Sequence, residues 1–202
     1  MNRKTLISTL VAALATVVLA GCSDTGTPAA PGAATTTAPA PAAAAARNDA
    51  DVAFVQGMIP HHAQAIEMSQ LAEQRATNPQ VKQLAATIAQ AQGPEIEQMQ
   101  ALLQSWGLPA QPTGPDAMDH GSMPGMPVMM SDEQMQQLEQ ASGPEFDRMW
   151  LQMMIEHHTG AIQMAETELR EGQNAEAKAL AQKIIDEQRA EIAQMQELLQ
   201  TV

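Results

Sequence analysis

The sequence repeats itself at a constant offset of 96 residues. The segment GMIPHHAQAIEM at 57–68 returns as MMIEHHTGAIQM at 153–164, and VKQLAATIAQAQGPEIEQMQALLQ at 81–104 returns as AKALAQKIIDEQRAEIAQMQELLQ at 177–200. Two separate blocks that share one offset indicate an internal duplication. The chain must therefore build its fold from two copies of the same small unit.

The N-terminal region reads as a targeting segment followed by a tether. Residues 1–22 carry Arg3 and Lys4, then a mainly apolar run, and end in Leu-Ala-Gly-Cys. This pattern predicts a bacterial lipoprotein signal in which Cys22 bears the lipid; an ordinary cleaved secretory signal is the alternative. The run is shorter than the ~20 residues of a membrane-spanning helix. Residues 23–47, rich in Ala, Pro and Thr, predict a tether to a bacterial membrane or envelope.

Charge and composition narrow the class of protein. The net charge of −13 disfavours nucleic acid as a partner. Cys22 is the only cysteine, so no disulfide within the chain can stabilise the fold. Methionine is abundant, at 15 of 202 residues. Methionine fills cores, but its thioether is also a ligand for soft metal ions.

Helical periodicity and helix-end signals predict four long helices, near residues 51–75, 79–106, 144–170 and 175–200. Candidate N-terminal caps are Asn48 and Asn174, while Gly107 and Gly172 are candidate stops. Ser131 with Gln134 three residues later predicts a capping box that begins a short extra helix.

Short links near residues 76–79 and 171–174 predict two antiparallel helical hairpins. The expected fold is all-α: an antiparallel four-helix bundle at 48–202, made of two duplicated hairpins at 49–107 and 131–202. A long crossover at 108–130 joins them. Two copies that are each apolar on one side bury those sides best against each other.

The paired histidines lie on the apolar side of the first helix in each hairpin. Met58, His61 and Met68 share one stripe, and His62 lies on the neighbouring stripe. Folding the hairpin about residue 77 or 78 brings Met99 and its neighbours level with them. The duplicate repeats this arrangement. Glu95, Glu191, Gln92 and Gln188 are expected to support the site.

Imidazole and thioether ligands together favour copper over iron. Cu(I) is expected to be preferred and Cu(II) to be tolerated. Bundles that bind two irons use Glu-x-x-His, where this sequence has Met-x-x-His. The side chains of adjacent residues point about 100° apart on a helix, so two adjacent histidines can hardly bind the same metal ion. Two sites, or one per hairpin with His62 and His158 in support, are expected. The alternative is a hydrogen-bonded histidine core. The candidate ligands are Met58, His61, His62, Met68, Met99, Met154, His157, His158, Met164 and Met195.

The crossover holds a second group of candidate ligands within MDHGSMPGMPVMM. A loop without a core has little packing use for five methionines. The segment is interpreted as an exposed, weaker copper-collecting site, and a low-complexity linker is the alternative. Its candidate ligands are Met118, His120, Met123, Met126, Met129 and Met130.

The segments FVQGMIPHHAQAIEM at 54–68, FDRMWLQMMIEHHTGAIQM at 146–164 and the two EIxQM motifs at Glu95 and Glu191 resemble the bacterial family named domain of unknown function 305. The resemblance covers nearly all of 49–202. It implies a ferritin-like bundle in a secreted or lipid-anchored protein, and some members are periplasmic copper-binding proteins implicated in copper tolerance. The residues that correspond to the family's motif are Met58, His61, His62 and Met68 in the first copy and Met154, His157, His158 and Met164 in the second.

The favoured function is an extracytoplasmic, lipid-anchored protein that sequesters or transfers copper, with a copper-handling protein as a candidate partner. The sequence leaves the oligomeric state open. A b-type haem protein is one rival, although Cys-x-x-Cys-His is absent and aromatic residues are few. An envelope protein without a metal is another. An enzyme is disfavoured because neither a Glu-x-x-His pair nor a nucleophile with a base is evident.

Overall fold

The structure is a computed structural model that describes residues 46–113 and 129–202. The predicted signal segment, Cys22 and most of the tether lie outside these ranges. Five helices are described: α1 (Asp49–Arg75), α2 (Pro79–Ser105), α3 (Asp132–Gln140), α4 (Gly143–Glu171) and α5 (Ala175–Leu198). None of them is long and apolar enough to cross a membrane.

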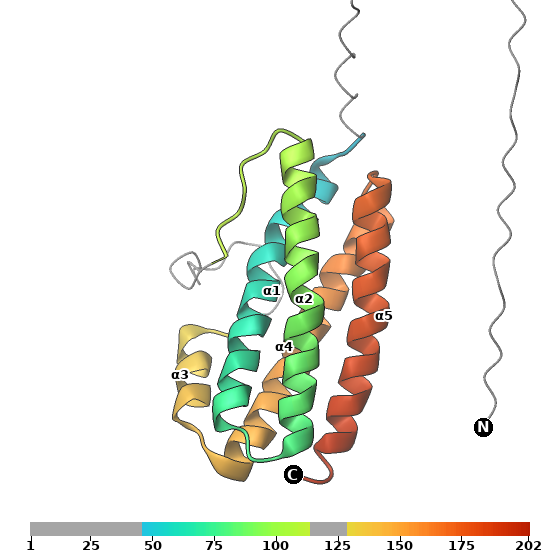
Figure 1. Ribbon diagram of the computed structural model, residues 1–202. Helices are drawn as coiled ribbons and strands as arrows, with labels where there is room; N and C mark the ends of the chain where they lie inside the picture. Colours follow the sequence, from blue (N-terminus) through green and yellow to red (C-terminus); the bar gives the residue numbers. More distant parts are fainter. Residues whose placement is uncertain (1–45, 114–128) are drawn as a thin grey trace, which may run out of the picture. The chain divides into compact units, whose positions relative to one another are not determined.

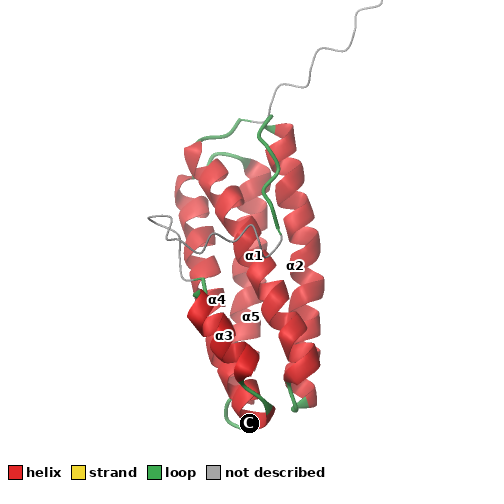
Figure 2. Ribbon diagram, turned by 90° about the vertical axis from the view of Figure 1, so that its left-hand side faces the viewer, coloured by secondary structure: helices red, strands yellow, loops and turns green. Residues whose placement is uncertain are grey.

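The predicted four-helix bundle is confirmed. Helices α1 and α2 form one hairpin and α4 and α5 the other, and the hairpins pack through α1 against α4 and α2 against α5 (Figure 1). The short helix α3 lies beside the bundle, at the end where α4 begins (Figure 2). Pro60 and Pro94 are accommodated inside α1 and α2, which continue through them.

Local side-chain chemistry sets most of the helix ends, as predicted. Asn48 and Ser131 each form a reciprocal capping box, and Asn78 and Asn174 accept bonds from the first turns of α2 and α5. After α2, Gly107 adopts a φ of 72°, which favours glycine and stops the helix.

Gly172 ends α4 for a different reason from the one its sequence position suggests. Its φ is −69°, which any residue can adopt, so left-handed backbone is not the requirement. A Cβ at this position would collide with the carboxyl group of Glu168, one turn earlier. A larger residue here would have to displace the buried carboxyl group of Glu168.

Two aspartates at equivalent places in the duplication lock the hairpins together. Asp51 Oδ1 accepts bonds from the backbone N–H groups of Gln173 and Asn174, at 2.9 and 2.8 Å. In the other direction, Asp147 accepts from the backbone N–H of Thr77 at 3.0 Å, from its hydroxyl at 2.6 Å, and from Asn78 N–H at 2.9 Å. The first turn of each hairpin therefore satisfies the free donors at the turn of the other.

A second carboxyl group, Glu168, is buried beside Asp51. Burial, and then the hydrogen bond and charge of Asp51, raise the pKa of Glu168 to about 8. Burial also opposes ionisation of Asp51, but bonds from Asn48, Asn174, Glu168 and Gln173 hold its pKa below the usual range. At neutral pH Glu168 is thus protonated and lies beside the ionised Asp51.

This carboxyl pair makes stability depend on pH. Between about pH 4.5, where an unfolded Glu168 titrates, and about pH 8, the folded state binds one more proton than the unfolded state. The contribution of Glu168 is fully present below pH 4.5 and is lost as the pH rises through 8. We expect Glu168→Gln to flatten this fall, measured as unfolding free energy in urea at pH 5.5 and 8.5. An equally steep fall in the variant would contradict the assignment.

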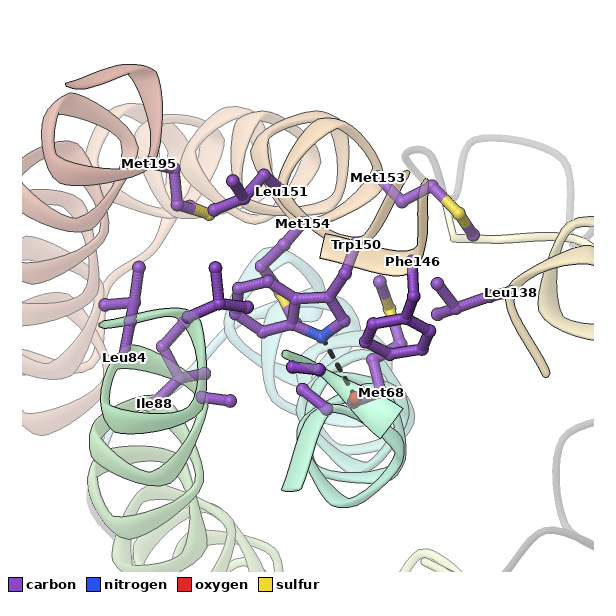
Figure 3. Close-up of a cluster of buried hydrophobic side chains, with 14 of the residues drawn as sticks. Met68, Leu84, Ile88, Leu138, Phe146, Trp150, Leu151, Met153, Met154 and Met195 are labelled. Atoms are coloured by element: carbon purple, nitrogen blue, oxygen red, sulfur yellow. Dashed lines mark hydrogen bonds between the residues drawn. The ribbon is translucent and has the colours of Figure 1, made fainter. Parts of the chain in front are cut away.

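The apolar core consists of two clusters at opposite ends of the bundle. One contains Met68, Ile88 and Trp150, whose indole N–H donates to the Met68 carbonyl oxygen at 3.0 Å (Figure 3). The other contains Phe54 and Leu103. Along all four long helices, the residues of the two clusters are separated by one intervening stretch of sequence.

Candidate metal site

The stretch between the two apolar clusters forms a buried polar layer. Each long helix contributes to it from the segment that separates its two sets of core residues. The side chains of this polar layer, all buried except the partly exposed Glu191, are His61, His62, Gln92, Glu95, His157, His158, Gln188 and Glu191. The prediction that both histidine pairs face the interior is confirmed.

At the centre of the layer, His61 and His157 meet across the two hairpins. Their ring centroids are 3.7 Å apart and the rings are tilted by 40°. Helices α1 and α4 run antiparallel, since the first turn of α1 bonds the end of α4 through Asn48 and Glu171. The expectation of two sites, or of one site per hairpin, did not include this contact between histidines of different hairpins.

The electrostatics of the centre keep His157 uncharged. Burial, and then the neighbouring imidazoles of His61, His158 and His62, hold the pKa of His157 well below its usual value. Neither of its ring nitrogens has a hydrogen-bond partner. A neutral imidazole offers one lone pair, which is the form that binds a metal ion.

The outer histidines are each held by a glutamate from the partner helix of their own hairpin. His62 Nε2 lies 2.7 Å from Glu95 Oε2, and His158 Nε2 lies 2.7 Å from Glu191 Oε2. With Nε2–H donating to the carboxylate, Nδ1 carries the lone pair, and in both residues Nδ1 is buried without a partner. Metal-binding histidines are commonly oriented in this way. This arrangement is compatible with the supporting role expected of His62 and His158, and it places Glu95 in contact with His62.

Burial tends to raise the pKa of Glu95, but bonds from His62 and then Lys183 outweigh it and hold the pKa below its usual value. Lys183 Nζ lies 2.7 Å from Glu95 Oε1. Sequence reasoning missed Lys183, although the duplication carries a signal: the equivalent residue in the first hairpin is Thr87. The same comparison would have drawn attention to Asp51 and Asp147, which are identical at the shared offset.

The predicted methionine ligands flank the polar layer in a grouping that crosses the hairpins. Met58 and Met99 belong to one apolar cluster, and Met164 of the second hairpin packs against that cluster. Met154 and Met195 belong to the other, together with Met68 of the first hairpin. The antiparallel packing of α1 on α4 causes this exchange. Each of the two apolar clusters therefore receives methionines from both hairpins.

The buried polar atoms of the layer fit a soft metal ion. The amide of Gln92 and the oxygen of Gln188 have no hydrogen-bond partner, as is true of both nitrogens of His157. Buried polar groups normally have partners, so a cluster of exceptions indicates a bound species. Within the two described ranges, no three His, Cys, Asp or Glu side chains gather in a way that could hold one metal. Imidazole completed by thioether suits copper better than zinc or iron.

The structure corrects one part of the predicted crossover site. Met130 is fully buried, and its backbone exchanges two hydrogen bonds of 2.8 Å with the side-chain amide of Gln64. It is therefore a core residue that docks the end of the crossover on α1, and its interpretation as an exposed ligand is wrong. Met129 is partly buried. Met118, His120, Met123 and Met126 lie outside the described residues.

Comparison with known proteins identifies the family. The family described as "Domain of unknown function (DUF305)" matches residues 51–199, nearly the whole folded region. The chain belongs to the DUF305 family. A DUF305 protein from Streptomyces coelicolor, described as secreted, is 34% identical, with a TM-score of 0.66 over 75% of this chain and 93% of that one. The resemblance seen in the sequence is thus confirmed.

Another solved structure similar to this DUF305 chain contains copper. CopM in the Cu(II)-bound form is 34% identical, with a TM-score of 0.64 over 75% of this chain and 96% of CopM. CopM is also known in Cu(I)-bound, silver-bound and apo forms. Uncharacterized protein L153 of Acanthamoeba polyphaga mimivirus is 43% identical over 53 residues, which are 26% of this chain. The match spans 35% of the length of that viral protein.

Proposed function

We propose that this protein binds copper in the polar layer, and that the layer sequesters or hands on the ion outside the cytoplasm without catalysing a reaction. The observation that carries the proposal is the contact of His61 with His157, 3.7 Å apart between hairpins in a layer flanked by thioethers. The copper-bound forms of CopM support it, because CopM shares the fold and about a third of the sequence.

The chemistry of the layer favours Cu(I) over Cu(II). Cu(I) prefers soft ligands and accepts few of them, so imidazole nitrogens with thioether sulfurs suffice. His157 is already neutral and needs to release no proton on binding. The apolar clusters above and below exclude water, which favours a singly charged ion over a doubly charged one.

The thioether part of the proposal is tested by replacing Met58 and Met154 with leucine. Both residues are fully buried and leucine has a similar volume, so the unfolding free energy should change by less than ~1.5 kcal/mol. Cu(I) affinity, measured by competition with a chelator, should fall, while Cu(II) affinity should change little. Met135→Leu in α3 is the matched control, a buried methionine outside the layer. Unchanged Cu(I) affinity in the double variant would rule out thioether ligation.

A haem-binding function is less compatible with the layer. A porphyrin held between histidines of the two hairpins requires the rings to stand on opposite faces of the macrocycle. The 3.7 Å contact between His61 and His157 leaves no space for it. Binding one copper ion through both imidazoles also requires the two rings to move apart, but by much less than insertion of a porphyrin would.

We further propose that the protein acts at a membrane or envelope surface through a lipid on Cys22. The support is the signal-like segment and the secreted description of the Streptomyces coelicolor relative. Cys22→Ala should move the protein from the membrane fraction to the soluble fraction, or block its maturation. Unchanged fractionation together with unchanged protein mass would argue against lipidation.

The methionines and the histidine at 118–126 are proposed as a second, weaker site that collects copper.

A further inference from the structure

The duplication places the same histidine–glutamate pair at both ends of the polar layer. His62 with Glu95 lies between α1 and α2, and its copy, His158 with Glu191, lies between α4 and α5. Both nitrogen–oxygen distances are 2.7 Å, and both imidazoles are fully buried. One difference between the two ends lies in what surrounds the two carboxylates.

Those surroundings differ by one cation. At the first end, Lys183 of α5 reaches across to α2 and binds Glu95 at 2.7 Å, and it also pairs with Glu187 at 2.8 Å. Both oxygens of Glu95 are engaged, one by His62 and the other by Lys183, and its side chain is 5% exposed. This end of the layer is covered by a positively charged side chain.

The second end lacks this cover. The positions equivalent to Lys183 and Glu187 are Thr87 and Ala91. Helix α2 packs against α5 (Figure 1), so the two-fold relation between the hairpins assigns Thr87 of α2 to the place that Lys183 occupies on α5. Among the described residues, His158 is the hydrogen-bonding partner of Glu191, and no cation pairs with this carboxylate. The Glu191 side chain is 14% exposed, so it contacts both solvent and the buried imidazole.

We infer that the layer has one closed end and one open end, and that copper enters and leaves past Glu191 while Lys183 seals the Glu95 end. This inference rests on the proposed copper function and adds the route of exchange. An approaching cation is attracted by an uncompensated carboxylate and repelled by an ammonium group, and such local fields change association rates by about 10- to 1,000-fold. Glu191 also orients His158, so the ion meets a prepared ligand behind it.

The inference is tested by exchanging the two equivalent residues in the purified protein. Thr87→Lys places an ammonium group beside Glu191, and Lys183→Thr removes it from Glu95. Thr87→Gln adds length without charge and is the matched control. Stopped-flow mixing with Cu(I), and then with a Cu(I) chelator, gives the rates of uptake and release. Because Thr87 and Lys183 are both exposed, each variant should keep the bundle folded, which circular dichroism verifies.

We expect Thr87→Lys to slow uptake and release together by about tenfold, at nearly unchanged equilibrium affinity, because a barrier on the route affects both directions. Lys183→Thr should speed both rates, and Thr87→Gln should resemble the parent protein. Equal rates for Thr87→Lys and the parent, or slower exchange in Lys183→Thr, would overturn the route. A parent protein that binds no Cu(I) would instead remove the proposed function itself, so the two failures are distinguishable.

Discussion

Replacing His157 with leucine is expected to abolish tight copper binding and to leave the metal-free bundle more stable than the parent. His157 is fully buried and neutral, and neither ring nitrogen has a partner. An unsatisfied buried polar group costs ~1–3 kcal/mol, so an apolar side chain of similar size should raise the unfolding free energy by about 1–2 kcal/mol. Loss of an outer-shell partner already weakens metal binding about 10- to 100-fold, and loss of a ligand should weaken it further.

Urea denaturation of the metal-free protein and Cu(I) titration against a chelator measure the two effects separately. Gln163→Leu, an exposed substitution on the same helix, is the control and should change neither strongly. A His157→Leu variant that binds copper like the parent would remove His157 from the site. A variant destabilised by more than ~2 kcal/mol would show that the imidazole stabilises the fold, as expected of a hydrogen-bonded core histidine.

Asp147→Ala is expected to be the most destabilising substitution, at about 3–5 kcal/mol. The carboxylate is 2% exposed and accepts bonds from two backbone N–H groups and one hydroxyl of the opposite hairpin's turn. Hydrogen bonds to a charged group contribute ~1.5–3 kcal/mol each, and their loss leaves buried donors without partners. Because the bonds join residues far apart in sequence, docking of the two hairpins should weaken most.

Chemical denaturation, with Asp49→Ala as the control, measures this effect. Asp49 lies in the first turn of α1 but is exposed, so its removal should cost less than ~1 kcal/mol. An Asp147→Ala protein within 1 kcal/mol of the parent would show that the hairpins dock through their apolar clusters alone.

The sequence predicted the hairpins well because local signals determine them. The caps at Asn48, Asn174 and Ser131, and the stop at Gly107, act within one helical turn, and the structure places helix ends within about two residues of the predictions. Periodicity also placed both histidine pairs on the buried side. The constant offset of the duplication made the second hairpin predictable from the first.

The pairing of His61 with His157 was not predictable in the same way. Periodicity shows which face of a helix is buried, but not how far one hairpin slides along the other. The register is set by contacts between residues distant in sequence: Asp51 with Asn174, Asp147 with Asn78, and Trp150 with the Met68 carbonyl. Without them, the methionines were assigned to sites within single hairpins.

The prediction for Met130 was wrong for a different reason: it relied on the methionine content of the crossover segment. In sequence it ends a run rich in methionine and proline and reads as part of a loop. Its burial depends on Gln64, whose equivalent in the second hairpin is Gly160. This difference between otherwise similar helices was visible in the sequence, although nothing in it indicated that Gln64 binds the crossover.

The central claim is that copper binds where the two hairpins meet. A crystal structure of the Cu(I)-loaded protein, with anomalous scattering recorded on both sides of the copper absorption edge, locates the ion independently of any assumed ligand. We predict an anomalous peak in the polar layer, beside His61 and His157 and within bonding distance of at least one imidazole nitrogen and one methionine sulfur. Peaks found only at the 118–126 segment or on the acidic surface, with the layer free of copper, would contradict the claim.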